Sequence, residues 1–167
     1  MLFIRFKQTN LGVSMSKKLL IAASLLLPLV AFAQKPITTC AKNDAEIAKL
    51  FDRWNASLAT LDPQKVAANY ADSAILLPTV DSDVHDLPAE RITYFTMFLK
   101  KKPVGTITER HIRRFCNVAI DSGTYLFKLT GEDGKVSDVA ARYTFVYQNT
   151  SKGWKIIEHH SSVFPQK

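Results

Sequence analysis

The last apolar segment of the chain holds an acid and a base at a spacing that could move a proton. Side chains of an extended strand alternate between two faces, so Glu158 and His160 are expected on one face, together with Trp154, Ile156 and Ser162. A carboxylate two residues from a histidine can orient the imidazole and tune its pKa, which suits general acid–base catalysis. The alternative is a satisfied polar pair on a solvated face, or a contact between subunits.

Arg142 is the second candidate, because it lies in the apolar stretch 140–145. An arginine in such surroundings usually binds an anion with both arms of its guanidinium or forms a buried ion pair. The ion-pair alternative has three candidate partners, Asp121, Asp138 and Glu158. If the last hairpin closes with Tyr147 opposite Trp154, Arg142 lies opposite His159, and a bulge would change that register.

Other chemistry finds little support in the sequence. The polar segment 81–86 offers Asp81, Asp83, His85 and Asp86, but it lacks the glycine and the distal glutamate of an EF-hand loop, and a solvated loop is expected. No Gly-x-Gly-x-x-Gly motif, zinc spacing or P-loop is present, so we expect neither a cofactor nor a metal. Trp54, Tyr70, Tyr94 and Tyr125 are aromatic residues with polar groups, and they could line a ligand pocket or fill the core.

The pattern of apolar residues predicts the elements that position these side chains. Apolar residues at three- and four-residue steps predict a helix over 44–61, capped by Asn43 or Asp44. Asp62 and Pro63 then start a short helix that ends near Ala71. The remaining predicted elements are a strand over 74–78, a helix from Pro88 to about Leu99, and strands over 106–115, 119–130, 136–148 and 154–164.

Three helices followed by a four-strand antiparallel meander predict an α+β domain. Several strands carry polar residues among the apolar ones, which suggests a curved antiparallel sheet around a cavity.

The N-terminus has the pattern of an export signal. Met15 to Lys18 is basic, residues 19–32 are apolar, and Ala31-Phe32-Ala33 forms a small-x-small cleavage site. We expect cleavage after Ala33, with either Met1 or Met15 as the start, and a periplasmic or secreted protein without a membrane anchor. An uncleaved anchor is the alternative. The predicted organisation is a signal over 1–33, a lead-in over 34–42 and one domain over 43–167.

Charge and cysteine content fit an exported domain. The chain has a net charge of +7, but residues 1–33 hold four bases and no acid, so 18 basic and 15 acidic side chains remain and give +3. This mild balance argues against a nucleic-acid partner. Cys40 and Cys116 are the only cysteines and suggest a disulfide in an oxidising compartment, worth on the order of 4 kcal/mol in the chain-entropy model. Two free buried thiols are the alternative.

The order of elements, with Asp62-Pro63 between the first helices and Ala119–Tyr125 opening a strand, resembles the cone-shaped NTF2-like superfamily, also called SnoaL-like or cystatin-like. The ending Gly153–Ser162 is similar to the last strand of the calcium/calmodulin-dependent protein kinase II association domain. More closely, it resembles small exported bacterial proteins of the SgcJ/EcaC type. The resemblance covers about residues 41–165.

The resemblance implies a homodimer or higher homo-oligomer with a pocket inside the cone. The eukaryotic hub lines this pocket with arginines, but two of these positions fall on Phe145 and Ser161, and only Lys128 could replace a third. The matching histidine is His160. The sequence contains no kinase domain, so neither the hub's ligand nor its kinase-assembly role is expected to transfer.

Three functions are compatible with this reading. We favour an oligomeric binding or accessory module whose pocket takes a small molecule, an anionic one if Arg142 contacts it. The expected lining of the pocket is Arg142, His160, Tyr125, Trp54 and Tyr94. The second is an enzyme of the isomerase or cyclase kind, with His160 as the base and Arg142 or a tyrosine steadying an anion. The third is a pure assembly module.

Overall fold

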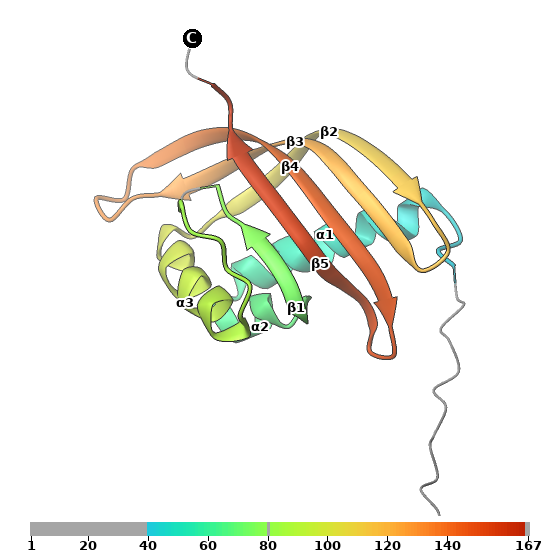
Figure 1. The fold of residues 1–167 in the computed structure, drawn as a ribbon. Helices are drawn as coiled ribbons and strands as arrows, with labels where there is room; N and C mark the ends of the chain where they lie inside the picture. The colour runs from blue at the N-terminus through green and yellow to red at the C-terminus, as the bar shows by residue number, and fades with distance from the viewer. Residues whose placement is uncertain (1–39, 80, 166–167) are drawn as a thin grey trace, which may run out of the picture. The chain divides into compact units, whose positions relative to one another are not determined.

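The computed structural model describes residues 40–79 and 81–165 (Figure 1). The predicted export signal over 1–33 lies outside these residues, as does most of the predicted lead-in. Among the residues that the structure describes, no helix is long and apolar enough to span a membrane.

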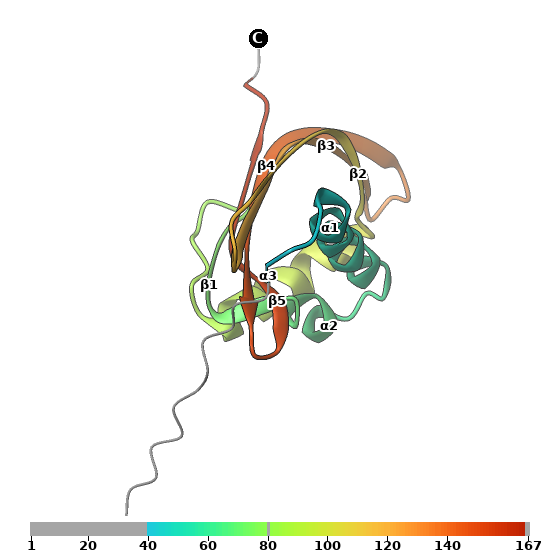
Figure 2. The ribbon, with the colours of Figure 1, turned by 90° about the vertical axis from the view of Figure 1, so that its right-hand side faces the viewer.

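The first helix, α1 (Asp44–Ala59), forms as its pattern predicts. Asn43 caps it, because its side-chain Oδ1 accepts a hydrogen bond of 3.0 Å from the backbone N–H of Glu46. Its apolar face is buried and consists of Ile47, Leu50, Phe51, Trp54 and Leu58. This face turns toward the sheet that arches over the helix (Figure 2).

Each of the next two helices has a proline as its first residue. Asp62 caps α2 (Pro63–Ala67), since its Oδ1 accepts from the N–H groups of Gln64 and Lys65. α2 is shorter than predicted because the chain becomes extended at Tyr70, where β1 (Tyr70–Leu77) begins. α3 (Pro88–Phe98) continues into the 3₁₀ helix η1 (Leu99–Lys101).

The other four strands form the antiparallel meander that the sequence predicts, and they are β2 (Val104–Arg114), β3 (Val118–Thr130), β4 (Val136–Thr150) and β5 (Gly153–Val163). The sheet order is β1-β5-β4-β3-β2. β1 pairs with β5 in parallel, so the complete sheet is mixed and not wholly antiparallel. Phe115, predicted within a strand, follows the end of β2 and is exposed.

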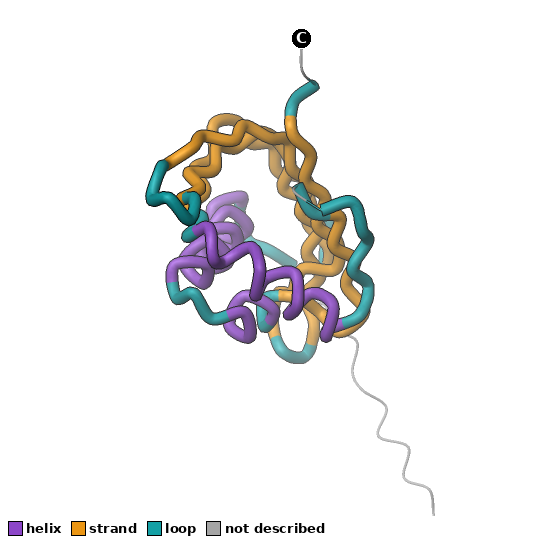
Figure 3. The backbone as a smooth tube through the Cα atoms, turned by 90° about the vertical axis from the view of Figure 1, so that its left-hand side faces the viewer, coloured by secondary structure: helices purple, strands orange, loops and turns teal. Residues whose placement is uncertain are grey.

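The sheet is strongly curved, and all helices lie on its concave side (Figure 3). β-bulges increase the bend and twist of a strand, and register irregularities interrupt three strand pairs, β1–β5, β2–β3 and β4–β5. The bulge on β2 brings the carbonyl of Glu109 so close to Gly123 that a Cβ there would lie 2.0 Å from it. The α+β cone predicted from the sequence is confirmed.

A disulfide joins Cys40 to Cys116 across 76 residues of sequence. Cys40 precedes α1, and Cys116 lies in the turn between β2 and β3. The predicted disulfide is therefore present, and it ties the segment before α1 to the sheet.

Candidate functional site

The interior of the curved sheet receives His159 and not His160, because β5 contains a bulge. β4 pairs Tyr147 with Ile156 and then Val146 with Glu158, so Ile157 is the extra residue. Beyond this point the inward positions move from even to odd residue numbers. His159 and Ser161 are buried, each only 4% exposed, whereas Glu158 and His160 are exposed. The prediction that Glu158 and His160 share the face of Trp154 and Ile156 is therefore wrong.

His159 is enclosed by aromatic rings. Its imidazole stacks on Phe145 with ring centroids 4.0 Å apart, and the indole of Trp54 meets it edge-on at 5.3 Å. Burial lowers the pKa of His159 to about 3, and the nearby His160 contributes to the same direction. The imidazole is consequently neutral at physiological pH.

A short hydrogen-bond chain fixes the tautomer of this neutral imidazole. The indole N–H of Trp54 donates to the hydroxyl oxygen of Tyr70 at 3.1 Å, and that hydroxyl lies 2.8 Å from Nδ1 of His159. If Nδ1 carried the proton, both the Tyr70 hydroxyl proton and the Nε2 lone pair would be unsatisfied. Both arrangements contain the same two hydrogen bonds, but only one group, the Nε2–H, is left unsatisfied when Tyr70 donates to Nδ1, so we assign the proton of His159 to Nε2. Nε2 is buried and has no hydrogen-bond partner in the described part of the chain.

A small cavity lies beside His159. Its volume is about 10 Å³, close to the space that a single water molecule needs. Its polar lining includes Ser161, whose Oγ accepts a 2.5 Å hydrogen bond from the Tyr125 hydroxyl and also contacts the hydroxyl of Thr79. The interior site thus combines one imidazole donor with a group of hydroxyls in aromatic surroundings.

Three predicted pocket residues meet around this cavity, namely Trp54, Tyr94 and Tyr125. All three are buried. Tyr94 and Phe98 also line a second space of about 280 Å³ nearer the surface, together with Asp81, His85 and Met97. The sequence therefore identified the aromatic wall of the interior, although the ligand role of these residues stays a prediction.

The other predicted site residues lie outside the interior. Arg142 is exposed, pairs across the sheet with Ser162, and donates a long hydrogen bond of 3.4 Å to the carbonyl of Val163. None of the ion pairs of the described residues includes it, and its proposed partners Asp121 and Asp138 pair with Arg110 and Lys128. Arg142, Glu158 and His160 therefore do not converge with Trp54, Tyr94 and Tyr125.

A second polar cluster lies under α1, and the sequence indicated Asp121 as an ion-pair partner but not Arg110. Asp121 is fully buried, and its Oδ2 lies 3.2 Å from Nε of Arg110. The hydroxyl of Tyr143 donates to Oδ1 of Asp121 at 2.9 Å, and the Arg110 guanidinium lies 5.5 Å from the ring centre of Phe51. Burial raises the pKa of Asp121 although Arg110 and Tyr143 act in the opposite direction. We regard this cluster as a structural ion pair.

Arg91 of α3 is also buried and serves the backbone. Its guanidinium donates to four carbonyl oxygens, those of Ala71, Asp72, Ala74 and Asp86. These bonds hold β1 and the segment before α3 together.

The acidic segment 81–86 lies at the surface. His85 Nε2 lies 3.3 Å from Oδ2 of Asp81, and its ring lies against Tyr94 at 5.3 Å. Among the residues that the structure describes, no group of three or more acidic, histidine or cysteine side chains could hold a metal ion.

An α+β cone with helices on the concave face of a strongly bent sheet is the NTF2-like, or cystatin-like, fold. The family model of the calcium/calmodulin dependent protein kinase II association domain matches residues 43–165, and the chain belongs to this family. No curated protein matches the chain. The finer SgcJ/EcaC type stays a prediction.

Solved structures agree with this assignment. A structure from Xanthomonas campestris with the same association-domain designation is 48% identical, covers 78% of this chain and 97% of its own, and has a TM-score of 0.72. A hub homology domain from Chlamydomonas reinhardtii is 20% identical over 73% of this chain and 98% of its own, with a TM-score of 0.61. An NTF2-like superfamily protein from Salmonella enterica is 16% identical over 74% and 92%, with a TM-score of 0.64.

Proposed function

We propose that this chain is an exported homo-oligomeric module that associates with further copies of itself through the outer face of its sheet. The observation that carries the proposal is the chain's membership in an association-domain family. The similarity of its fold to a kinase hub homology domain is consistent with the same role.

The outer face of β3, β4 and β5 has a composition that suits such a contact. Cross-strand rows on this face run Ile120–Val146–Glu158, Ser122–Thr144–His160 and Thr124–Arg142–Ser162. β-branched and small polar side chains dominate these rows, and the helices do not cover this face, since they lie on the other side of the sheet (Figure 2). Ile75 of β1 extends the first row and is 41% exposed. Glu158, His160 and Arg142 fit the polar rim of such an interface.

The oligomeric state in solution tests this proposal. Light scattering coupled to size exclusion should give a dimer or larger species for residues 34–167. Val146→Lys should shift it to monomer, because a charge then lies beside Ile120 in the row that holds the apolar residues of the face. Val136→Lys is the matched control, because Val136 is exposed at the far hairpin of β3 and β4. A wild-type monomer at micromolar concentration, or equal dissociation of both variants, would contradict the proposal.

Export is the second part of the proposal. The signal pattern of residues 15–33 supports it, and so does a Cys40–Cys116 disulfide, which persists in oxidising compartments. Protein from a bacterial periplasmic fraction should have the intact mass of a chain that starts at Gln34. This mass should be two hydrogens lower than that of the reduced chain. A mass that retains residues 15–33 would contradict cleavage.

A small-molecule role is the second candidate, and the unpartnered Nε2–H of His159 favours it. A buried donor that lacks a hydrogen-bond partner costs free energy, so a ligand with an acceptor atom at this position would bind more tightly. The cavity of about 10 Å³ admits little more than water, and a larger ligand requires Tyr94 and Phe98 to turn toward the neighbouring space of about 280 Å³. A fragment screen by ligand-observed NMR, repeated on His159→Phe, tests this role. Binding that survives the substitution would place the ligand elsewhere.

Proton transfer by Glu158 and His160 receives no support, because both side chains face away from the interior. His159 occupies the interior instead, but its lowered pKa makes it a weak base.

A further inference from the structure

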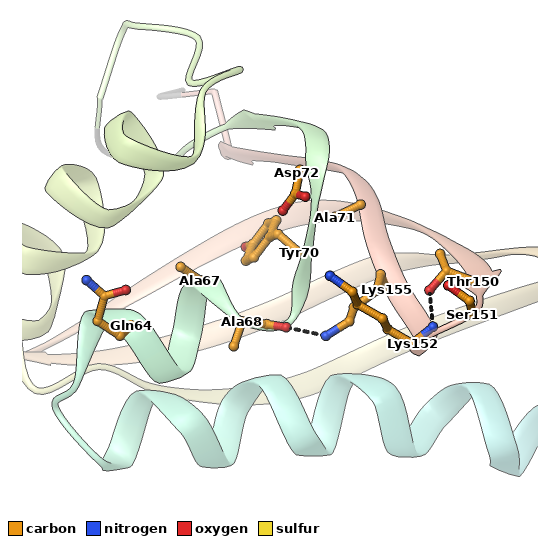
Figure 4. Close-up of a pocket in the computed structure, with 10 residues that line it drawn as sticks. All are labelled: Gln64, Ala67, Ala68, Tyr70, Ala71, Asp72, Thr150, Ser151, Lys152 and Lys155. Atoms are coloured by element: carbon orange, nitrogen blue, oxygen red, sulfur yellow. Dashed lines mark hydrogen bonds between the residues drawn. The ribbon is translucent and has the colours of Figure 1, made fainter. Parts of the chain in front are cut away.

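We propose that the pocket between α2, the start of β1 and the β4–β5 turn binds a small oxyanion, a molecule that presents a carboxylate or phosphoryl group (Figure 4). The pocket has a volume of about 500 Å³, large enough for a metabolite-sized molecule. It lies apart from the interior cavity beside His159 and from the outer rows of β3 to β5.

Two ammonium groups provide the positive charge. Figure 4 shows the side chains of Lys152 and Lys155 reaching from the turn and from β5 toward the end of α2. Nζ of Lys155 donates a 2.6 Å hydrogen bond to the carbonyl oxygen of Ala68, which fixes the position of the amine. An ammonium group has three donors, so two remain for a ligand.

The two ammonium groups outnumber the carboxylates that line this pocket. None of the ion pairs of residues 40–79 and 81–165 includes Lys152 or Lys155. Asp72 is the one carboxylate among the residues that line the pocket. Burial lowers the pKa of Lys155, repulsion from Arg53 and Lys152 acts in the same direction, and Asp72 opposes it. An anion between the two amines would relieve this repulsion.

The remaining lining limits the size and chemistry of the ligand. Ser151 and Gln64 add side-chain hydrogen-bonding groups, and Ala67 and Ala71 provide small apolar surfaces. The ring of Tyr70 lines the pocket, while its hydroxyl belongs to the hydrogen-bond chain of His159. A ligand with a short carbon skeleton and one anionic group at the lysine side matches this lining.

Titration with inorganic phosphate, followed by amide shifts in ¹H–¹⁵N NMR spectra at low ionic strength, tests the proposal. We expect saturable shifts confined to residues 67–72 and 150–155. Lys152→Gln/Lys155→Gln should weaken binding by about a hundredfold, because each of the two lost charged hydrogen bonds costs roughly a factor of ten. A parallel titration with acetate distinguishes a phosphoryl from a carboxylate preference.

The matched control is Lys100→Gln/Lys101→Gln, which removes the same total charge from adjacent lysines at η1, away from this pocket. It should bind phosphate as the wild type does. Lys152→Gln alone covers the case in which the double variant fails to fold, because Lys152 is exposed and only its backbone N–H is hydrogen-bonded. Non-saturating shifts across the whole surface, or equal weakening in the pocket and control variants, would overturn the proposal.

Discussion

The hydroxyl of Tyr70 lies 2.8 Å from Nδ1 of His159, and this contact joins the edge strand β1 to its neighbour β5 through two residues that are 89 apart in sequence. Tyr70 begins β1 and His159 lies in β5, so the hydrogen bond spans the parallel pair that closes the cone. Trp54 of α1 extends the same chain of hydrogen bonds. One strand pair and one helix are therefore linked through a buried neutral imidazole.

Removing the Tyr70 hydroxyl should destabilise the fold. Tyr70→Phe leaves Nδ1 of His159 and the indole N–H of Trp54 without their partner, and we expect a loss of about 1–3 kcal/mol in the free energy of unfolding. Urea denaturation measures it. The control is Tyr147→Phe, because the Tyr147 hydroxyl is equally buried but has no hydrogen-bond partner in the described structure. This control should change stability by about 0.5 kcal/mol or less, or increase it. Equal losses in both variants would contradict the assigned chain.

The buried imidazole also predicts a pH dependence. The pKa of His159 falls from 6.5 to about 3 on folding, so the unfolded state binds a proton that the folded state rejects. The contribution of neutral His159 is present above about pH 6.5 and is lost as the pH falls toward 3, by at most about 1.4 kcal/mol per pH unit. Urea denaturation from pH 8 to pH 4 should show this loss in the wild type and not in His159→Gln. His111→Gln is the control, because His111 is exposed and pairs with Glu109.

The tautomer of His159 is a separate prediction from the same geometry. Long-range ¹H–¹⁵N NMR spectra should show a neutral imidazole protonated at Nε2 throughout pH 5 to 8, because Tyr70 occupies Nδ1 as the donor. His160 is exposed and provides an internal comparison in the same spectra. Protonation at Nδ1 would reverse the direction of the hydrogen bond with Tyr70.

The sequence predicts the elements well because each has a local cause. Asn43 and Asp62 cap their helices as expected, and the change from helical to alternating periodicity separates the helices from the β2–β5 meander. The face of β5 could not be predicted in the same way. One extra residue at Ile157 exchanges every later side chain between the two faces, and no residue type in the segment marks that bulge.

The interior site was therefore only half predictable. Trp54, Tyr94 and Tyr125 can be selected by residue type, as aromatic residues with polar groups, whereas the contact of Tyr70 with His159 depends on a parallel pairing between strands distant in sequence. Asp121 did carry a signal, since it alternates in phase with the buried residues Ala119 and Tyr125. A carboxylate on that face indicates a buried partner, but not that the partner is Arg110.

The disulfide should contribute substantially to stability. Cys40→Ser/Cys116→Ser should lower the free energy of unfolding by about 2–5 kcal/mol. The reason is that the bond links residues 76 apart in sequence and so restricts the conformations of the unfolded chain. Thermal denaturation with and without a reductant measures the effect. The reductant should lower the melting temperature of the wild type and leave the double variant unchanged. If full reduction left the melting temperature of the wild type unchanged, this role would be contradicted.

The ion pair of Arg110 and Asp121 should be costly to break from one side. Asp121→Asn keeps the shape of the side chain but removes the ion-pair partner of the Arg110 guanidinium beside Phe51, and the expected loss is about 3–5 kcal/mol. Asp138→Asn is the matched control, because Asp138 pairs with Lys128 at the surface, where the expected loss is about 1 kcal/mol or less. Adding Arg110→Met to Asp121→Asn should restore part of the stability, since no unpaired charge then remains buried. If the double variant is less stable than Asp121→Asn alone, Arg110 stabilises the fold by contacts other than its charge.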